Sequence, residues 1–221
     1  MTFLTPQHPS DEPLRAEIVR TSLKMNTLGI NAGKSGNVSA RVDIGFLVTP
    51  TGIAYEDTHP RQIVAVRMDG THDGNILPSS EWRFHRDIYA ARPDVNAIVH
   101  THAPYATTLA CMDRGIPSFH YMVAAAGGQD IRCAPYATFG TQALSDFAVA
   151  ALIDRNACLL SHHGMIACGR DLEKALALAV EVEMLARMYW QALQIGEPVL
   201  LSDKEMTTVL AKFATYGQQP A

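Results

Sequence analysis

Residues 79–102 read SSEWRFHRDIYAARPDVNAIVHTH, and this stretch sets the fold class because it places a helix shortly before a strand. Ser79 and Ser80 are residues that often precede a helix, and the segment 81–92 after them is predicted to be helical until Pro93 stops it. Residues 96–102 are rich in apolar and β-branched side chains and are predicted to form a strand.

The same two kinds of element recur on both sides of this stretch. Residues 14–28 have helical spacing, and Gly29 ends the pattern. Further strands are predicted at 37–42, 45–50, 62–68 and 157–163, and further helices at 104–112, 142–154, 171–193 and 204–214. Because these elements come in clusters without strict alternation, we expect one α/β domain over residues 1–221, with a mixed or mainly antiparallel sheet covered by helices. The proline-rich start, residues 1–13, is expected to be a loose leader.

The composition excludes several classes of protein. The 221 residues are 48% hydrophobic and 18% charged, which is ordinary for a globular protein. Lys and Arg number 18 against 22 Asp and Glu, for a net charge of −4, and no basic run is present, so we expect no nucleic-acid partner. No apolar stretch reaches the ~18 residues of a membrane span. The four cysteines form no Cys-x-x-Cys pair and no signal peptide precedes them, which predicts reduced thiols and a cytoplasmic location.

A glycine-rich segment at residues 29–36, GINAGKSG, invites comparison with a nucleotide-binding P-loop. Gly29 and Gly33 are separated by three residues where that motif needs four, and the segment follows a predicted helix rather than a strand. These two mismatches disfavour a nucleotide site. Gly33, Gly36 and Asn37 still suit a backbone nest, in which neighbouring N–H groups point at one anion.

Two predicted strands end in histidines. His100 and His102 lie two residues apart, so their side chains point to the same side of a strand and can reach one metal ion. The spacing alone is equally consistent with two unrelated histidines. The strand predicted at 157–163 ends in His162 and His163, which would point to opposite faces, so one of them is expected to complete an open three-histidine site.

The start of the helix at 81–92 offers a second kind of chemistry. The hydroxyls of Ser79 and Ser80, with the unpaired N–H groups of a helix start, suit a phosphate group. Glu81 follows immediately and is a candidate general acid or base. Serine caps and acidic residues in a first turn are also common without any ligand, and these residues considered alone favour that simpler interpretation.

In combination, these motifs resemble the class II aldolase/adducin family, and within it the branch of sugar-phosphate aldolases. The motifs HTH, HHG and SSE are specific for the superfamily, and further similarity covers nearly the whole chain in order. The matching stretches are SGNVSARV (35–42), TPTGIAYED (49–57), LPSSEWRFHRDIYAARPDVNAIVHTH (77–102), HYMVAAAGG (120–128), CAPYATFGT (133–141), SHHGMIACG (161–169) and FATYG (213–217).

The resemblance implies a single α/β/α domain with a largely antiparallel central sheet, assembled as a homotetramer. Position by position, it implies that His100, His102 and His163 bind one zinc ion per chain. It also implies that Glu81 is the catalytic acid or base, close enough to the metal to ligate it when substrate is absent.

The resemblance assigns roles to other residues as well. Tyr121 and Tyr216 match tyrosines that reach an active site across a subunit interface and act in catalysis, and Phe139 matches a residue at the aldehyde end. His85 and His120 are expected to be structural hydrogen-bonding groups rather than ligands. The residues that resemble a phosphate site are Asn37, Thr51, Gly52, Ser79 and Ser80.

The implied reaction is the reversible cleavage of a ketose 1-phosphate into dihydroxyacetone phosphate and a small aldehyde. The implied substrate is L-fuculose 1-phosphate or a related deoxypentulose or methylthioribulose 1-phosphate. The choice among these stays open, because the chain has Lys34 where the resemblance calls for a small hydroxyl residue. Alternatives on the same scaffold are a pentulose-phosphate epimerase, dehydratase or decarboxylase, although epimerases usually carry Asp where this chain has Glu81. A non-enzymatic adducin-like interaction domain is a further alternative, but it has no use for an open metal site.

Overall fold

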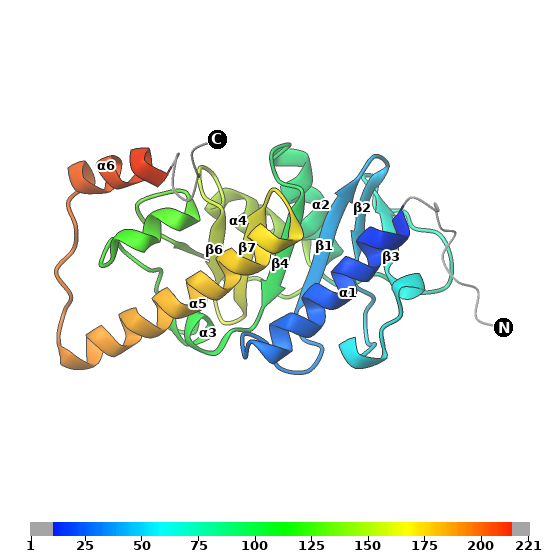
Figure 1. The fold of residues 1–221 in the computed structure, drawn as a ribbon, viewed down its shortest axis with the longest axis horizontal. Helices are drawn as coiled ribbons and strands as arrows, with labels where there is room; N and C mark the ends of the chain where they lie inside the picture. The colour runs from blue at the N-terminus through cyan, green and yellow to red at the C-terminus, as the bar shows by residue number, and fades with distance from the viewer. Residues whose placement is uncertain (1–10, 214–221) are drawn as a thin grey trace, which may run out of the picture.

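A seven-stranded sheet runs through the middle of the computed structural model, which describes residues 11–213 (Figure 1). The strands are β1 Asn37–Val42, β2 Gly45–Val48, β3 Val64–Arg67, β4 Ala97–Thr101, β5 Arg132–Ala134, β6 Ala157–Leu160 and β7 Gly164–Gly169. They lie in the order β3-β2-β1-β4-β7-β6-β5, and every neighbouring pair is antiparallel except the parallel pair β5 and β6. The expectation of a largely antiparallel sheet is confirmed.

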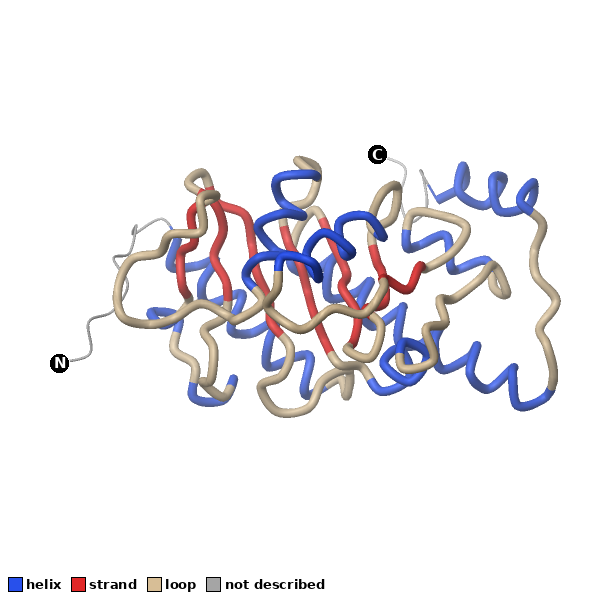
Figure 2. The backbone as a smooth tube through the Cα atoms, turned by 180° about the vertical axis from the view of Figure 1, so that it is seen from behind, coloured by secondary structure: helices blue, strands red, loops and turns tan. Residues whose placement is uncertain are grey.

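Helices cover both faces of this sheet. The face turned to the viewer in Figure 1 carries α1 (Glu12–Thr27), α3 (Pro104–Ala110) and α5 (Leu172–Ile195). Figure 2 shows the opposite face, which carries α2 (Trp82–Ala91) and α4 (Gln142–Ala151). At one end, α6 (Asp203–Phe213) packs beside the 3-10 helix η4 (Tyr121–Ala126), and two short 3-10 helices, η2 (Tyr55–Asp57) and η3 (Pro60–Gln62), precede β3.

Each face of the sheet has its own hydrophobic core, because neighbouring residues of a strand point to opposite faces. On β4, Val99 joins the core beneath α1 and α5, whereas Ile98 joins the core beneath α2 and α4. On β7 the same alternation separates Ala167 from Ile166. The chain is therefore an α/β/α sandwich, as the resemblance implied.

The structure corrects the sequence analysis at three places. Helix α1 begins at Glu12, so the expected leader does not extend to residue 13. Strands β5 and β7 carry no clear strand signal, because β5 has only three residues and β7 begins and ends with glycine. The strand predicted at 157–163 ends at Leu160, since residues 161–163 form the turn into β7.

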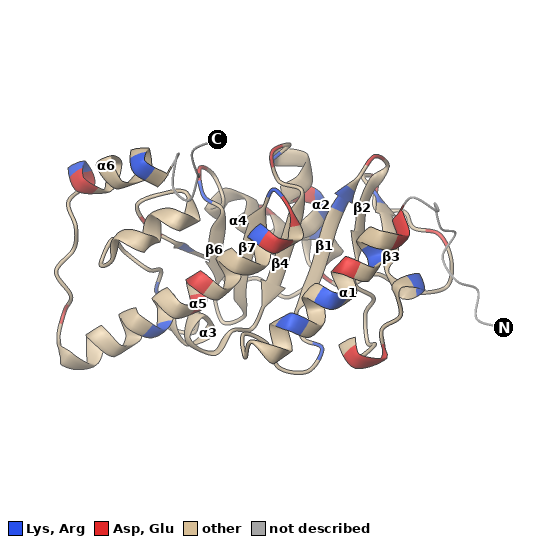
Figure 3. Cartoon of the chain, viewed as in Figure 1, with Lys and Arg blue, Asp and Glu red and all other residues tan. Residues whose placement is uncertain are grey.

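Charged side chains are spread over the surface of this sandwich. Figure 3 shows basic and acidic residues interspersed along α1 and α5. Among the described helices, none has both the length and the apolar character that a membrane crossing requires. The four cysteines are unbridged, with Cys158 and Cys168 buried and Cys111 exposed. A group of three histidines, His100, His102 and His163, lies where β4 ends and β6 turns into β7.

Candidate active site

Three histidines meet at this end of the sheet. His100 lies on β4, His102 follows just beyond the end of that strand, and His163 lies in the turn between β6 and β7. The antiparallel register pairs Thr101 with Met165, so the chain leaving β4 runs beside the chain entering β7. The sheet thus brings together two histidine motifs that are far apart in the sequence.

The three imidazole rings form a nearly equilateral triangle. Their centroids are 5.1 Å apart for His100 and His102, 4.8 Å for His100 and His163, and 5.0 Å for His102 and His163. The angles between the ring planes are 73°, 72° and 78° in the same order. One ring nitrogen of each histidine lies within 4.8 Å of the other two. Such a cluster suits one metal ion with a further position left open for substrate.

The tautomer of His100 is fixed by the backbone. Its Nδ1 lies 2.9 Å from the carbonyl oxygen of Met165, and the ring is wholly buried. Because a carbonyl oxygen only accepts hydrogen bonds, Nδ1 carries the proton and Nε2 is left with a lone pair. The Nε2 atoms of His100 and His102 are both buried without a hydrogen-bond partner. Both nitrogens are thus available as metal ligands.

The turn that presents His163 is tightly constrained. Gly164 lies so close to β4 that an added Cβ atom would be 2.5 Å from the carbonyl oxygen of Thr101 and 3.0 Å from Cδ2 of His102. His162 has a φ of 53°, in the left-handed region that is costly for residues other than glycine. The turn therefore directs His163 toward the other two ligand candidates. The sequence analysis instead explained the orientation of His162 and His163 by alternation along a strand, and that explanation was wrong.

Glu81, the N-cap residue of α2, faces the same point. Its Oε2 lies 3.2 Å from Nε2 of His100, and its Oε1 lies 3.2 Å from Nε2 of His163. The side chain of Asn37 donates a hydrogen bond to Oε2 at 2.9 Å, whereas Oε1 has no hydrogen-bond partner. One carboxylate oxygen is thus anchored by a hydrogen bond, and the other is not.

The surroundings control the charges of these groups. Burial acts to raise the pKa of Glu81, but the neighbouring imidazoles of His100 and His163 together lower it more, so the net pKa lies below its usual range. Burial, together with His100 and His163, lowers the pKa of His102 to about 4. Near neutral pH, His102 is therefore neutral, which is the form of imidazole that binds a metal.

This donor set fits a bound cation. A cation placed among a carboxylate and ring-nitrogen lone pairs is a partner for all of them at once. Oε1 of Glu81 and the Nε2 atoms of His100 and His102 are buried and have no hydrogen-bond partner, so a cation bound among them would supply the partner that they lack. Imidazole nitrogens with one carboxylate oxygen are donors that suit zinc and similar divalent ions.

The metal-ligand candidates open into a cavity of about 270 Å³. Its rim carries two aromatic side chains, Phe139, which is 66% exposed, and Tyr136, which is 61% exposed. Phe139 thus lines the same cavity as the metal-ligand candidates, and its place at the aldehyde end stays a prediction; Tyr136 and Ser35 also line the cavity and were not singled out from the sequence. The lining residues are Ser35, Ser80, Glu81, His102, Tyr136, Ala137, Phe139, His162 and His163.

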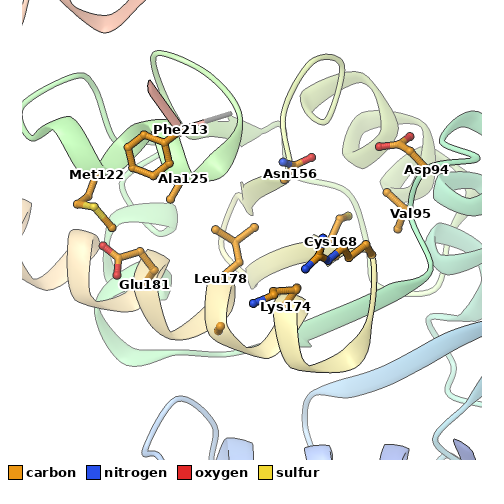
Figure 4. A pocket seen from close by; sticks show the side chains of 13 residues that line it. Asp94, Val95, Met122, Ala125, Asn156, Cys168, Lys174, Leu178, Glu181 and Phe213 are labelled. Atoms are coloured by element: carbon orange, nitrogen blue, oxygen red, sulfur yellow. The ribbon is translucent and has the colours of Figure 1, made fainter. Parts of the chain in front are cut away.

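A larger cavity, of about 640 Å³, lies beside α5 (Figure 4). Its labelled side chains include Asp94, Lys174 and Glu181 as well as the apolar Leu178 and Phe213. None of the three clustered histidines lines it. The smaller cavity, where titratable groups converge on one point, is therefore the candidate active site.

Of the predicted phosphate-binding residues, Ser80 lines the small cavity, and hydrogen bonds connect its loop to the loop of Thr51 and Gly52 and that loop to the glycine-rich loop. The backbone N–H of Thr51 donates to the carbonyl oxygen of Leu77 at 3.1 Å, so the loop that contains Gly52 lies beside the loop that leads to Ser80. Lys34 ties the glycine-rich loop to the same place, because its Nζ donates to the carbonyl oxygen of Gly52 at 2.8 Å. An ammonium group thus stands beside the expected phosphate position.

The structure places other predicted residues differently. Asn37 does not line the cavity, because it is 2% exposed and its side-chain amide binds Glu81 and His85. Tyr121 is 47% exposed and lines a separate cavity beside α6, which none of the three clustered histidines lines. Tyr216 lies outside the described residues. The proposed roles of these three residues stay predictions.

Comparison with known proteins gives a consistent result. A family model described as "Class II Aldolase and Adducin N-terminal domain" matches residues 16–190. The chain is 56% identical over 204 residues to the 5-methylthioribulose-1-phosphate/5-deoxyribulose-1-phosphate aldolase of Rhodospirillum rubrum, with 92% of each chain covered. It is 54% identical over 205 residues to the L-fuculose phosphate aldolase of Escherichia coli, with 92% of this chain and 95% of that enzyme covered. A solved structure of an L-fuculose 1-phosphate aldolase superposes with a TM-score of 0.89 at 36% identity, covering 95% of this chain and 98% of that one.

Proposed function

This chain belongs to the class II aldolase and adducin family, and from that premise we propose how it works as a metal-dependent aldolase of sugar phosphates. It cleaves a ketose 1-phosphate reversibly into dihydroxyacetone phosphate and a small aldehyde. The observation that carries the mechanism is the convergence of three imidazoles and the Glu81 carboxylate on one point of a cavity. The relatives named above suggest L-fuculose, 5-methylthioribulose and 5-deoxyribulose 1-phosphates as substrates.

The metal is proposed to be zinc, one ion per chain. His100, His102 and His163 would hold it, with Glu81 as a further ligand when no substrate is present. When bound, the ion supplies a Lewis acid that stabilises the negative charge left on the ketone half as the carbon–carbon bond breaks. The nitrogen-rich donor set favours zinc over magnesium or calcium, which prefer oxygen ligands.

Glu81 is proposed to move the proton at the reacting carbon. Cleavage transfers the bonding electron pair to the dihydroxyacetone phosphate half and releases the hydroxyl proton of the half that becomes the aldehyde. The Glu81 carboxylate takes up one proton in exchange and delivers it to the enediolate carbon, which gives the ketone product with no net gain or loss of protons. In the direction of synthesis Glu81 removes that same proton. Its position in the wall of the cavity, between two of the histidines, supports this role.

The substrate phosphate is proposed to lie at the edge of the cavity where the three loops meet. Ser80, which lines the cavity, and the N–H groups at the start of α2 suit a phosphate oxygen, and the loop that contains Gly52 lies beside the loop that leads to Ser80. No Lys or Arg is among the residues described as lining the cavity, so Lys34, held on the carbonyl oxygen of Gly52, supplies the nearby positive charge. Fixing the phosphate positions the reacting carbons, which lowers the barrier by an amount that can rival the metal.

The active unit is proposed to be a homotetramer, acting in the cytoplasm, in which Tyr121 reaches the site of a neighbouring chain. Tyr121 begins η4, whose sequence YMVAAA is apolar, yet its own ring is 47% exposed. It lines a cavity of about 580 Å³ together with Phe119, Leu201 and Val209, so this surface has the apolar character of an interface. The hydroxyl of the Tyr121 ring is both a donor and an acceptor, and we propose that it exchanges a proton with the aldehyde oxygen.

We expect Tyr121→Phe to lower kcat on the order of 10²-fold, because it removes an acid/base hydroxyl and keeps the ring. Tyr105→Phe, at a tyrosine of α3 whose ring packs on Trp190, serves as the control and should leave kcat unchanged. Mixing Tyr121→Phe chains with inactive Glu81→Gln chains should restore part of the activity, since mixed assemblies contain intact composite sites. No recovery, with subunit exchange confirmed by mass spectrometry, would place Tyr121 outside a shared site.

The substrate is tested by a panel of ketose 1-phosphates that differ only in the aldehyde half, with dihydroxyacetone phosphate detected by a coupled assay. The exposed Phe139 and Tyr136 offer few directional contacts, so we expect cleavage of several members, including L-fuculose, 5-deoxyribulose and 5-methylthioribulose 1-phosphates. Product without release of dihydroxyacetone phosphate would indicate an epimerase or dehydratase instead. A protein that turns over no member of the panel, although loaded with metal, would contradict the aldolase mechanism.

A further inference from the structure

A chain of five polar side chains runs from Glu81 into the core between α2 and β1. Oε2 of Glu81 is 2.9 Å from Nδ2 of Asn37, and Oδ1 of Asn37 is 2.5 Å from Nε2 of His85. Nδ1 of His85 is 2.7 Å from Oγ of Ser39, which is 2.8 Å from the hydroxyl of Tyr89. All five residues are buried, with exposed fractions between 0% and 6%.

The spacing of these residues explains how the chain forms. Glu81, His85 and Tyr89 are four residues apart, so they lie on one face at the start and along the length of α2. Asn37 and Ser39 are two residues apart on β1 and point to the same face of the sheet. A polar stripe on the helix thus faces a polar pair on the strand, inside an otherwise apolar core.

The direction of every hydrogen bond in this chain follows from the charge on Glu81. A carboxylate only accepts, so the NH₂ group of Asn37 faces Glu81 and its carbonyl oxygen faces His85. His85 must then donate from Nε2, which leaves Nδ1 to accept the proton of the Ser39 hydroxyl. Ser39 in turn accepts from the hydroxyl of Tyr89. The chain has one consistent arrangement, and each member is satisfied in it.

The environment of His85 keeps this arrangement in place. The ring lies between two phenylalanines, with its centroid 6.3 Å from that of Phe46 and 4.6 Å from that of Phe84. Burial, with a smaller contribution from His100, lowers the pKa of His85 to about 3, so the ring is neutral and carries one proton. A neutral ring with its proton on Nε2 is what the hydrogen-bond directions require.

We propose that His85 is a positioning residue that fixes the amide of Asn37 and thereby anchors Oε2 of Glu81, leaving Oε1 as the oxygen that carries the catalytic proton. The geometry supports different roles for the two carboxylate oxygens, because Oε2 accepts a hydrogen bond from Asn37 and Oε1 has no hydrogen-bond partner. Without a donor at His85, the buried carbonyl oxygen of Asn37 loses its hydrogen-bond partner, so the amide is no longer held in the position from which it donates to Oε2. The inference rests on the proposed role of Glu81 as the acid/base.

The test uses three variants of the full-length, metal-loaded enzyme. His85→Phe keeps the aromatic packing and removes both ring nitrogens, and we expect kcat to fall about 10–100-fold with an unchanged KM for the ketose phosphate. His85→Gln keeps a donor near the Nε2 position and should recover part of that loss. Tyr89→Phe is the matched control, because it removes a buried hydroxyl at the far end of the chain while Ser39 still donates to His85. Metal content and melting temperature are measured for every variant.

These outcomes separate positioning from mere support of the fold. If the five hydrogen-bonded side chains serve only the stability of the fold, both Tyr89→Phe and His85→Phe should lower the melting temperature. In that case kcat should stay near the wild-type value in both variants, or it should fall by the same factor in both. Either result, or a His85→Gln variant no more active than His85→Phe, would overturn the proposal.

A spectroscopic measurement on the unaltered enzyme remains decisive if His85→Phe does not fold. A histidine-selective ¹⁵N NMR spectrum should show the ring of His85 protonated on Nε2 and unprotonated on Nδ1 near neutral pH, with the His85→Gln spectrum used for assignment. A proton on Nδ1 would reverse the chain and refute the inference. A wild-type enzyme that cleaves no ketose phosphate would instead refute the proposed function, which the substrate panel reports separately.

Discussion

Removal of the metal should abolish carbon–carbon cleavage, with turnover falling by about 10³-fold or more, because a Lewis-acid ion contributes several kcal/mol to stabilising the developing charge. Exhaustive dialysis against a chelator, followed by elemental analysis, gives the metal content beside the activity. We expect about one zinc ion per chain before dialysis, and recovery of activity when zinc is restored. The reason is that one ring nitrogen from each of His100, His102 and His163 lies within 4.8 Å of the other two, with the Glu81 carboxylate beside them.

A pair of histidine variants makes this test specific to the site. His102→Ala removes one ligand candidate and should lose both metal and activity. His59→Ala removes an exposed histidine at the start of η3 and should keep both. Full activity in protein shown to be free of metal would end the metal mechanism.

Glu81→Gln is expected to lower kcat by on the order of 10²-fold or more, because a general acid/base contributes that much to the rate. The amide is nearly the same shape as the carboxylate and can still accept the hydrogen bond from Asn37, so the fold should be preserved. Metal binding should persist through the three histidines. Steady-state kinetics and metal content measured on the same preparations check both statements.

The control for this variant is a carboxylate outside the site. Glu197→Gln changes an exposed residue in the segment after α5 and should behave as wild type. Glu81→Asp keeps the charge and withdraws it by one methylene, so we expect activity between those of Glu81→Gln and the unaltered enzyme. Turnover by Glu81→Gln equal to that of the wild type would show that Glu81 is only a residue at the start of a helix.

Most of the fold could be predicted from patterns that are local in the sequence. The helical spacing before Gly29 and the β-branched segment at 37–42 mark α1 and β1 to within a few residues. Strand β7 could not be found in this way, because GMIACG is short, rich in small residues and flanked by glycine at both ends. Its place beside β4 depends on pairing across the sheet, which no local pattern specifies.

The candidate site was predictable to a similar degree and for similar reasons. The spacing of His100 and His102 indicated a shared direction, and the resemblance to a known family supplied the choice of His163. Strand alternation was the wrong basis for expecting His162 and His163 to point to opposite faces, since both lie in the turn after β6, where His162 has a positive φ. The sequence shows that Glu81 and His85 are four residues apart and so share one face of α2. It does not show that this face packs against the polar residues of β1, because that depends on tertiary packing.

The exposed rim of the cavity has an evolutionary consequence. Phe139 and Tyr136 stand on the loop between β5 and α4, whereas Glu81 and His100 are embedded in the core. Substitutions at exposed loop positions usually change stability little, so mutations can accumulate at the rim without disturbing the groups that make and break bonds. With the aldehyde half at this rim, as proposed above, a lineage with this architecture can acquire new aldehyde substrates through substitutions at Phe139 and Tyr136. The same two positions are where a laboratory library for unnatural aldehydes should be diversified first.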